Sequence, residues 1–513
     1  MAQTADIFSN FGNRDKNRGQ SGGSGRDDAS KRSQTLRTQS LVSLISQFGL
    51  TAIGFLSTIY FTRTVDPSIV GVYFLFFSYN ALFYLFSESG IGEAGVKLIS
   101  EGRTKNEYYS ASMVLRLVYL MLVVALLLIS SVLFPESTIV KTGILWWIIA
   151  ALLIDYFYNS RIYAAYSDGK VNAFQVSLFL NTAVRSLFQI VFVWLGYHSF
   201  GLMGGFLAGM IAAAVFAQFY TSLKLVTFSK DIFKRLLTYA VLIFLVMSCY
   251  LVYQNIDVVF IGEYLGETEA GIYRIVYQFS MLAGLAAISM KAVLYPKFSA
   301  WNENGQIKEI TIGLQVGTNI SLMLAIPIFF SFLVLGSDFI SLFYGAAYMP
   351  GVVPLYLLSF IQVITVFMYL QGICLNAVSH PKFAFLSIAA GILANIVLNA
   401  VLIPDYGMEG AAIATIIAMT LNSVLSYLFL KKVIPVSYNW KSAAKMVAAS
   451  LIMCAFLLTV TYFIPVSNIP WLLVVFTAGG LLYGLILLKI DKPVHDEVAS
   501  MVKSFGVPWP RWL

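Results

Sequence analysis

The sequence predicts an all-α integral membrane protein with about 14 transmembrane helices, arranged as two parallel six-helix repeats and two extra C-terminal helices. The 513-residue chain is 59% hydrophobic and 11% charged, whereas soluble domains are about 25% charged. Continuous apolar runs of about 20 residues recur along it, as α-helices that cross a bilayer require. The alternating pattern of membrane β-strands is absent from the sequence. Two pairs of similar segments indicate the repeat.

The chain divides in order into tails, bundles and a linker. Residues 1–37 are rich in Gly, Ser and charge and lack the apolar core of a signal peptide, which predicts a disordered cytosolic tail. It is either an inert solvated segment or a regulatory arm. The later parts are an N-terminal bundle (38–222), a cytosolic linker (223–235), a C-terminal bundle (236–431), helices 13 and 14 (440–490) and a cytosolic tail (491–513).

Fourteen apolar segments account for these parts, and the first, second, fourth and tenth have the least distinct ends. The predicted spans are 39–63, 68–88, 109–133, 142–163, 171–195, 200–221, 237–262, 268–292, 310–336, 349–377, 383–404, 408–430, 441–464 and 469–488.

The positions of the charges predict the orientation. Of the 33 lysines and arginines, only Arg63, Lys141 and Arg274 fall in outer connections when the N-terminus is inside, and Arg116 and Arg185 fall within spans. The remainder lie on the cytosolic side, as the positive-inside rule requires. We therefore expect a multi-pass protein of the plasma (cytoplasmic) membrane, N-in and C-in, with fourteen rather than twelve spans. This topology accounts for the net charge of +8, and no nucleic-acid partner is expected.

Two sequence matches relate the halves of the chain. "GLMGGFLAGMIAA", from Gly201, aligns with "GMEGAAIATIIAM", from Gly407. "GVY", from Gly71, aligns with "GIY", from Gly271. Because each match has the same predicted orientation in both copies, the repeats are parallel and related by an axis along the membrane normal, as in some transporters. The glycines also allow close helix packing.

Polar residues inside the first bundle are candidates for a cargo site. Asn181, Arg185 and Gln189 recur every four residues and share a helix face. Asp155 lies near the predicted midplane, as Arg185 does, and we expect the two to form an ion pair. Arg116 lies inside the third span. A charge at mid-bilayer is costly and normally faces a cavity or a partner.

The second bundle supplies the remaining candidates. Asp257 and Arg274 lie at similar depth on either side of a short turn, and we expect them to pair. Gln278 shares a face with Arg274, and Asn395 aligns with Gln189 in the repeat. Cations and amides suit phosphate oxygens and sugar hydroxyls. Asp155 and Asp257 either couple transport to an ion or are structural, and any one polar residue could instead hold helices together.

Other site chemistries are not indicated. The three cysteines lie in apolar spans and the three histidines in separate connections, so neither a disulfide nor a metal site is expected. The longest predicted outer connection, "GSDFISLFYGAAY", leaves little room for an active site, and no catalytic or phosphate-loop motif is found. We expect a transporter that needs no cofactor, rather than an enzyme such as a glycosyltransferase.

Three stretches resemble a known family: "RTQSLVSLISQFGLTAIGFLSTIYFTRTVDPSIVGVYFLFFS", "NIDVVFIGEYLGETEAGIYRIVYQFS" and "GMEGAAIATIIA". They are similar to the polysaccharide transporter branch (Wzx-type oligosaccharide flippases) of the MOP superfamily, which also contains MATE exporters and MurJ lipid II flippases. The resemblance covers roughly residues 37–490 and implies two bundles around a central cavity. Asp257 and Arg274 match characteristic positions, whereas spans 1 and 2 carry fewer basic residues than is usual.

The resemblance implies that a polyprenyl-linked oligosaccharide moves from the inner to the outer leaflet. "GEAGVKLISEGRTKNEYYSAS" is similar to archaeal members, which would imply a dolichyl carrier, and an undecaprenyl carrier is the alternative. Glycan-assembly proteins are potential partners. Coupling to H⁺ or Na⁺ through Asp257 or Asp155 is a hypothesis, and movement driven by the cargo gradient alone is its alternative. The competing function is a MATE-like cation-coupled multidrug exporter, which fits less well because its cargo is usually cationic.

Overall fold

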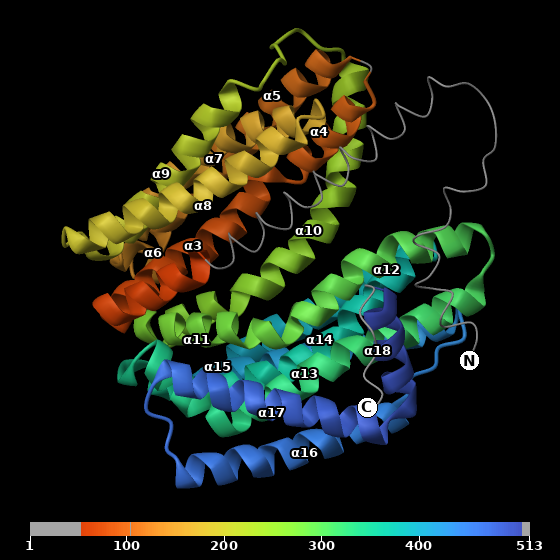
Figure 1. The fold of residues 1–513 in the computed structure, drawn as a ribbon. Helices are drawn as coiled ribbons and strands as arrows, with labels where there is room; N and C mark the ends of the chain where they lie inside the picture. The colour runs from red at the N-terminus through yellow and green to blue at the C-terminus, as the bar shows by residue number, and fades with distance from the viewer. Residues whose placement is uncertain (1–52, 103, 505–513) are drawn as a thin grey trace, which may run out of the picture. The chain divides into compact units, whose positions relative to one another are not determined.

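The computed structural model describes residues 53–102 and 104–504, and the regular secondary structure of this part is entirely helical (Figure 1). Eleven of its helices are long and apolar enough to cross a membrane. An all-α chain is expected in a bilayer because helices satisfy every backbone hydrogen bond within the segment. The predicted fold class is confirmed. The predicted tail 1–37 and most of the first span lie outside the described residues.

The number of spans, fourteen, stays a prediction. Helix α15 (Pro381–Lys431) covers two predicted spans, 383–404 and 408–430, and is broken at Gly407. Helix α7 (Ile144–Ser167) coincides with the predicted span 142–163 and is not among the eleven.

The described residues form two compact units. The N-terminal unit comprises residues 53–275 and 392–414, and the C-terminal unit comprises residues 276–391 and 415–504. These units are defined by packing, whereas the predicted bundles were defined by sequence repeat. The bundle boundaries therefore stay a prediction.

Most helices of the N-terminal unit overlap predicted spans, whereas the short helices α4 (Ile91–Ser100) and α6 (Thr138–Lys141) lie between them. In chain order the helices are α3 (Pro67–Glu88), α4, α5 (Lys105–Leu133), α6, α7, α8 (Val171–Trp194), α9 (His198–Gln218) and α10 (Lys230–Tyr264). The start of α11 (Glu267–Ser280) and the middle of α15 complete the unit.

The remaining helices belong to the C-terminal unit. They are η1 (Met281–Gly284), α12 (Leu285–Glu303), α13 (Ile307–Phe343), η2 (Ala346–Gly351), α14 (Val352–Ala377), α16 (Trp440–Phe463), α17 (Ile469–Ile490) and α18 (Lys492–Ser504), with the ends of α15. Much of the predicted outer connection "GSDFISLFYGAAY" is helical, because α13 runs on to Phe343.

Glycines of the repeated motif lie where the backbone breaks or where two segments approach closely. Gly407 has φ 59° and ψ −140°, a backbone conformation that side chains disfavour, and it breaks α15 where two predicted spans meet. A Cβ on Gly410 would lie 2.3 Å from the Leu402 carbonyl oxygen. In the other copy, a Cβ on Gly205 would lie 2.6 Å from the Gln189 backbone nitrogen. The glycines therefore permit close helix packing, as expected.

Helix α4 was not predicted, since its residues lie in the expected cytosolic connection between two spans. It begins after Gly90, which has φ 71°. Ile91, Ala94 and Leu98 are fully buried in a core that also contains Leu236 of α10. Hydrophobic residues at i, i+3 and i+7 form the packing face of a short amphipathic helix. Glu93 and Lys97 interrupt the continuous apolar run by which membrane spans were predicted.

Helix α18 occupies the segment predicted only as a cytosolic tail. Its Val494 is buried, and Glu497 and Val498 line a small pocket with Asn319 of α13. Burial, and then the charge of the neighbouring Asp491, raise the pKa of Glu497 to about 7. Asp491 is itself fully buried and lies 3.5 Å from Lys445 Nζ.

We predict that α18 docks more weakly as the pH rises from about 4 to about 7, with no further change above 7. The docked carboxyl group binds its proton more tightly than the exposed one, so the docked state is favoured at low pH and loses this advantage over that interval. Hydrogen exchange of α18 measures the effect. Glu497→Gln should abolish the pH dependence, whereas Asp496→Asn, on an exposed neighbour, should retain it. An unchanged slope in Glu497→Gln would contradict the assignment.

Candidate functional site

A buried ion pair joins α3 to α5 in the N-terminal unit. Arg116 Nε lies 2.6 Å from Glu88 Oε2, and the two side chains are 5% and 8% exposed. Arg116 Nη1 also donates a hydrogen bond of 2.8 Å to Ser160 Oγ of α7. Glu88 Oε1 accepts a hydrogen bond from the Gly92 backbone N–H at the start of α4. One guanidinium thus connects three helices deep within the unit.

Asp155 lies at the centre of α7, close to this ion pair. Both of its carboxylate oxygens lie 2.8 Å from Asn159 Nδ2, one helical turn away. Asn159 also donates to the Tyr84 hydroxyl at 3.2 Å. The charge of Arg116 acts on Asp155. The cluster therefore combines two carboxylates with one guanidinium.

The predicted Asp155–Arg185 ion pair is wrong. Among the described ion pairs, none joins these two residues. Helix α7 packs against α3, α5, α8 and α9, so Asp155 can face Arg116 of α5. Adjacency of two spans along the chain does not decide which face of the helix a residue occupies.

The polar stripe of α8 contacts its neighbouring helices. Asn181 Nδ2 donates to the Tyr158 hydroxyl of α7 at 2.9 Å, and the buried Gln189 donates to the Leu202 carbonyl of α9 at 2.8 Å. Arg185 is half-buried between them and forms no ion pair within the described residues. Asn181 and Gln189 thus hold helices together, and their role towards cargo stays a prediction. Arg185 is the one arginine of the stripe, and no ion pair involving its guanidinium is described.

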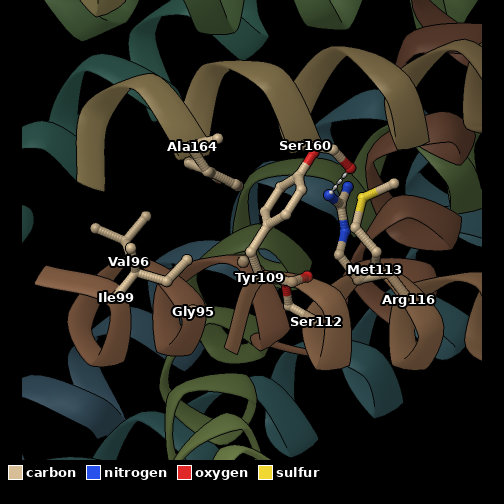
Figure 2. Close-up of a pocket in the computed structure, with 11 residues that line it drawn as sticks. Gly95, Val96, Ile99, Tyr109, Ser112, Met113, Arg116, Ser160 and Ala164 are labelled. Carbon is tan, nitrogen blue, oxygen red and sulfur yellow. Dashed lines mark hydrogen bonds between the residues drawn. The ribbon is translucent and has the colours of Figure 1, made fainter. Parts of the chain in front are cut away.

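Figure 2 shows a small pocket between α4, α5 and α7. Its lining includes Arg116, Ser160, Tyr109 and Tyr163, with Gly92, Gly95, Val96, Ile99, Ser112, Met113 and Ala164. Arg116 and Ser160, joined by their hydrogen bond, lie at one end, beside the Tyr109 ring (Figure 2). Its volume is at most about 270 Å³, whereas pockets for drug-sized ligands measure about 300–1,000 Å³. The pocket is therefore too small to enclose an oligosaccharide.

A second buried polar cluster surrounds Asp257 of α10. Its carboxylate accepts hydrogen bonds from the Tyr273 hydroxyl (3.0 Å) and from Asn399 Nδ2 (2.7 Å). Asn399 also lies 3.2 Å from Asn395 Oδ1, one turn away on α15. All four side chains are at least nine-tenths buried. The structure thus brings together Asp257 and Asn395, which the sequence placed in separate spans.

Arg274 lies on α11, next to Tyr273. Its Nη1 donates a 2.8 Å hydrogen bond to the Gln254 carbonyl oxygen, and its guanidinium lies 5.7 Å from the centre of the Phe77 ring. Its pairing with Asp257 stays a prediction. Gln278 lies one turn further along α11 and is half-buried. It belongs to the C-terminal unit, which begins at Val276.

Sequence reasoning missed Glu88, Asn159 and Asn399. Glu88 is the last residue of the predicted span 68–88 and was not singled out. Asn159 and Asn399 each follow a singled-out residue, Asp155 and Asn395, by four positions. Residues at i and i+4 are neighbours on a helix, so both could have been found from spacing. In the part of the chain that the structure describes, no group of three or more His, Cys, Asp or Glu could hold a metal ion.

Comparison with known proteins identifies relatives. The family model described as "Polysaccharide biosynthesis protein" matches residues 36–301. The "Probable low-salt glycan biosynthesis flippase Agl15" of Haloferax volcanii is 23% identical over 86% of this chain and 93% of its own length. The "Probable flippase AglR" of the same organism is also 23% identical, over 63% of this chain and 68% of its own length.

Solved structures share the fold. The lipid II flippase MurJ in an inward closed conformation has a TM-score of 0.73 and 19% identity, covering 88% of this chain and 99% of MurJ. An inward-facing multidrug resistance MATE transporter of the MOP superfamily has a TM-score of 0.62 and 14% identity, covering 75% of this chain and 94% of the transporter. Both likenesses establish the MOP-type fold.

Proposed function

Because this chain belongs to the polysaccharide biosynthesis protein family, we propose that it moves a polyprenyl-(pyro)phosphate-linked oligosaccharide from the inner to the outer leaflet by alternating access. Such movement would serve surface polysaccharide or glycoprotein biosynthesis. The observation that carries the proposal is the family match over residues 36–301, more than half of the chain. Curated relatives named as flippases support it. Both are archaeal, which favours a dolichyl over an undecaprenyl carrier.

The chemistry of the polar residues fits an anionic head group. Arg185 is half-buried on a membrane helix and has no described ion-pair partner. Its guanidinium can therefore donate hydrogen bonds to a phosphate oxygen. Charge-assisted hydrogen bonds from arginine to phosphate are about twice as strong as neutral ones. Asn181 and Gln189 lie on the same face of α8 as candidates for sugar hydroxyls. The lipid tail would stay in the bilayer while the head group crosses.

The competing proposal is a MATE-like multidrug exporter. The fold does not separate the two functions, since both MurJ and MATE structures match it. An intramembrane arginine without a described carboxylate partner favours anionic over cationic cargo. A drug-resistance phenotype without any change in glycans would reverse this preference.

Coupling to an ion is a further part of the proposal. Asp257 and Asp155 are our candidates for carrying H⁺ or Na⁺, and movement driven only by the cargo gradient is the alternative. Purified protein in proteoliposomes containing a lipid-linked oligosaccharide decides between them. Flipping that slows when either ion gradient is collapsed would support coupling, and an unchanged rate would contradict it.

We predict that Arg185→Ala lowers flipping by roughly tenfold or more, about the value of one charge-assisted hydrogen bond to the cargo. The measurement is the rate at which a lipid-linked oligosaccharide becomes accessible on the far side of proteoliposomes. Arg185→Lys should retain part of the activity because it keeps the charge. Arg235→Ala, which removes an arginine whose side chain is 49% exposed, is the matched control and should flip normally. Normal flipping by Arg185→Ala, at normal membrane levels, would remove Arg185 from the site.

A further inference from the structure

Equivalent glycines of the two sequence repeats touch one another in the N-terminal unit. A Cβ added to Gly271 of α11 would lie 2.7 Å from Gly71 Cα and 2.8 Å from Gly71 N. A Cβ on Gly71 of α3 would lie 1.8 Å from the Glu267 carbonyl oxygen. The two helices therefore cross backbone to backbone, at a distance that only glycine permits.

The contact between Gly71 and Gly271 joins equivalent positions of the two repeats. Gly71 begins "GVY" and Gly271 begins "GIY", which are matching positions of the two repeats. When equivalent residues of two parallel repeats meet, the axis that relates the repeats passes between them. In a transporter of this kind the cargo path follows that axis. A backbone contact on the axis closes the path at that level.

Hydrogen bonds to Glu263 also connect the two repeats, near the C-terminal end of α10. Tyr79 of α3 donates its hydroxyl hydrogen to Glu263 Oε1, near the end of α10. Thr138 Oγ1, at the start of α6, donates to Glu263 Oε2 at 3.0 Å. One carboxylate of the second repeat thus binds two segments of the first. A Cβ on the preceding Gly262 would lie 2.3 Å from Leu75 Cδ2, so α10 and α3 are also closely packed here.

The end of the unit that carries these contacts is opposite most of its basic residues, with Arg63 and Lys141 among the exceptions. Lys97, Lys170 and Lys224 lie in the segments between α3 and α5, α7 and α8, and α9 and α10. The Gly71 crossing lies instead at the start of α3 and the start of α11. By the positive-inside rule this end faces outward.

We propose that Gly71, Gly271 and Glu263 form an outer seal of the transport path, which opens when the protein releases cargo. The seal rests on the proposed alternating-access function. The glycines bring the repeats into backbone contact, and Glu263 holds the contact with hydrogen bonds that can break without loss of the fold. If the crossing were instead a permanent packing contact, it would stay closed throughout the cycle.

A reversible cross-link tests this distinction. In a background with Cys249, Cys374 and Cys454 replaced by alanine, Thr138→Cys and Glu263→Cys are combined and joined by a short bifunctional thiosulfonate. We expect cross-linking to stop flipping, and reductant to restore it. In each single-cysteine protein, the reagent should leave the flipping rate at the value measured for that same variant before treatment. Undiminished flipping by fully cross-linked protein would overturn the seal.

An accessibility measurement tests the seal without cargo. Phe77→Cys, six residues beyond Gly71 on α3 and half-buried, reports whether the path is open to a membrane-impermeant maleimide from outside. We expect Gly71→Leu to raise its labelling rate roughly tenfold or more, because minor conformations are usually populated at about 0.1–10%. Gly372→Leu, at a helical glycine with no atom within 4 Å of an added Cβ, is the control. Equal labelling in the two folded proteins would overturn the seal.

The two measurements also separate the seal from the proposed function. If the labelling rate rises as expected but no lipid-linked oligosaccharide is flipped, the seal stands and the cargo assignment fails. If Gly71→Leu does not accumulate in the membrane, the cross-link decides, because it uses a protein with both glycines intact.

Discussion

Replacing Arg116 by leucine should lower the free energy of unfolding by roughly 3–5 kcal/mol, since it leaves Glu88 buried as an unpaired charge. The two side chains are nearly inaccessible and lie 2.6 Å apart. The substitution also removes the donor to Ser160 and the positive charge that acts on Asp155. Thermal unfolding of the purified protein in detergent measures the loss, and membrane levels should fall with it.

The double variant Glu88→Leu/Arg116→Met supplies the control. Replacing both members of a buried ion pair with apolar residues is often neutral or stabilising, because neither charge is then left without a partner. We expect the double variant to recover the part of the lost stability that comes from the unpaired Glu88, while Asp155 still lacks the charge of Arg116. If it is stable but does not flip, Arg116 has a role beyond holding the unit together. Wild-type unfolding of the Arg116→Leu protein would contradict the structural role of the pair.

This ion pair shows what the sequence could and could not predict. A charged residue within an apolar span predicts a partner, and Arg116 has one. The partner's identity depends on which helix faces which, and that is set by packing among many spans. Asp155 and Arg185 lie on adjacent spans at similar depth, yet Arg116 is the cation that acts on Asp155. The depth of a residue in the bilayer can be estimated by counting along the sequence. Which faces of two helices contact each other cannot be obtained in this way.

The fold was more predictable than the site because membrane spans depend on local hydropathy, whereas the site depends on which helix faces contact each other. Hydropathy measures how favourable it is to move a segment from water into lipid, and the long apolar helices of the described residues overlap the predicted spans. Hydropathy failed for α4, which has ten residues rather than the roughly 20 that a span needs and whose packing face alternates with Lys97 and Glu93. The break at Gly407 was predictable because local backbone sterics, not tertiary packing, place it.

Asp257→Asn should eliminate any part of the flipping rate that depends on an ion gradient. Asparagine is nearly the size of aspartate but can neither release a proton nor balance the charge of a cation. The measurement is the flipping rate in proteoliposomes with and without an imposed H⁺ or Na⁺ gradient. Persistence of gradient-dependent flipping in Asp257→Asn would exclude Asp257 as the coupling residue.

Tyr273→Phe provides the comparison that separates coupling from structure. It removes one of the two described hydrogen bonds to the Asp257 carboxylate but keeps the charge. Loss of such a bond costs about 1 kcal/mol of stability. If Asp257 is only structural, both variants should lose stability and both should keep the response to the gradient. If Asp257 carries the ion, only Asp257→Asn loses the response, because Tyr273 and Asn399 position the carboxylate and the charge itself binds the ion.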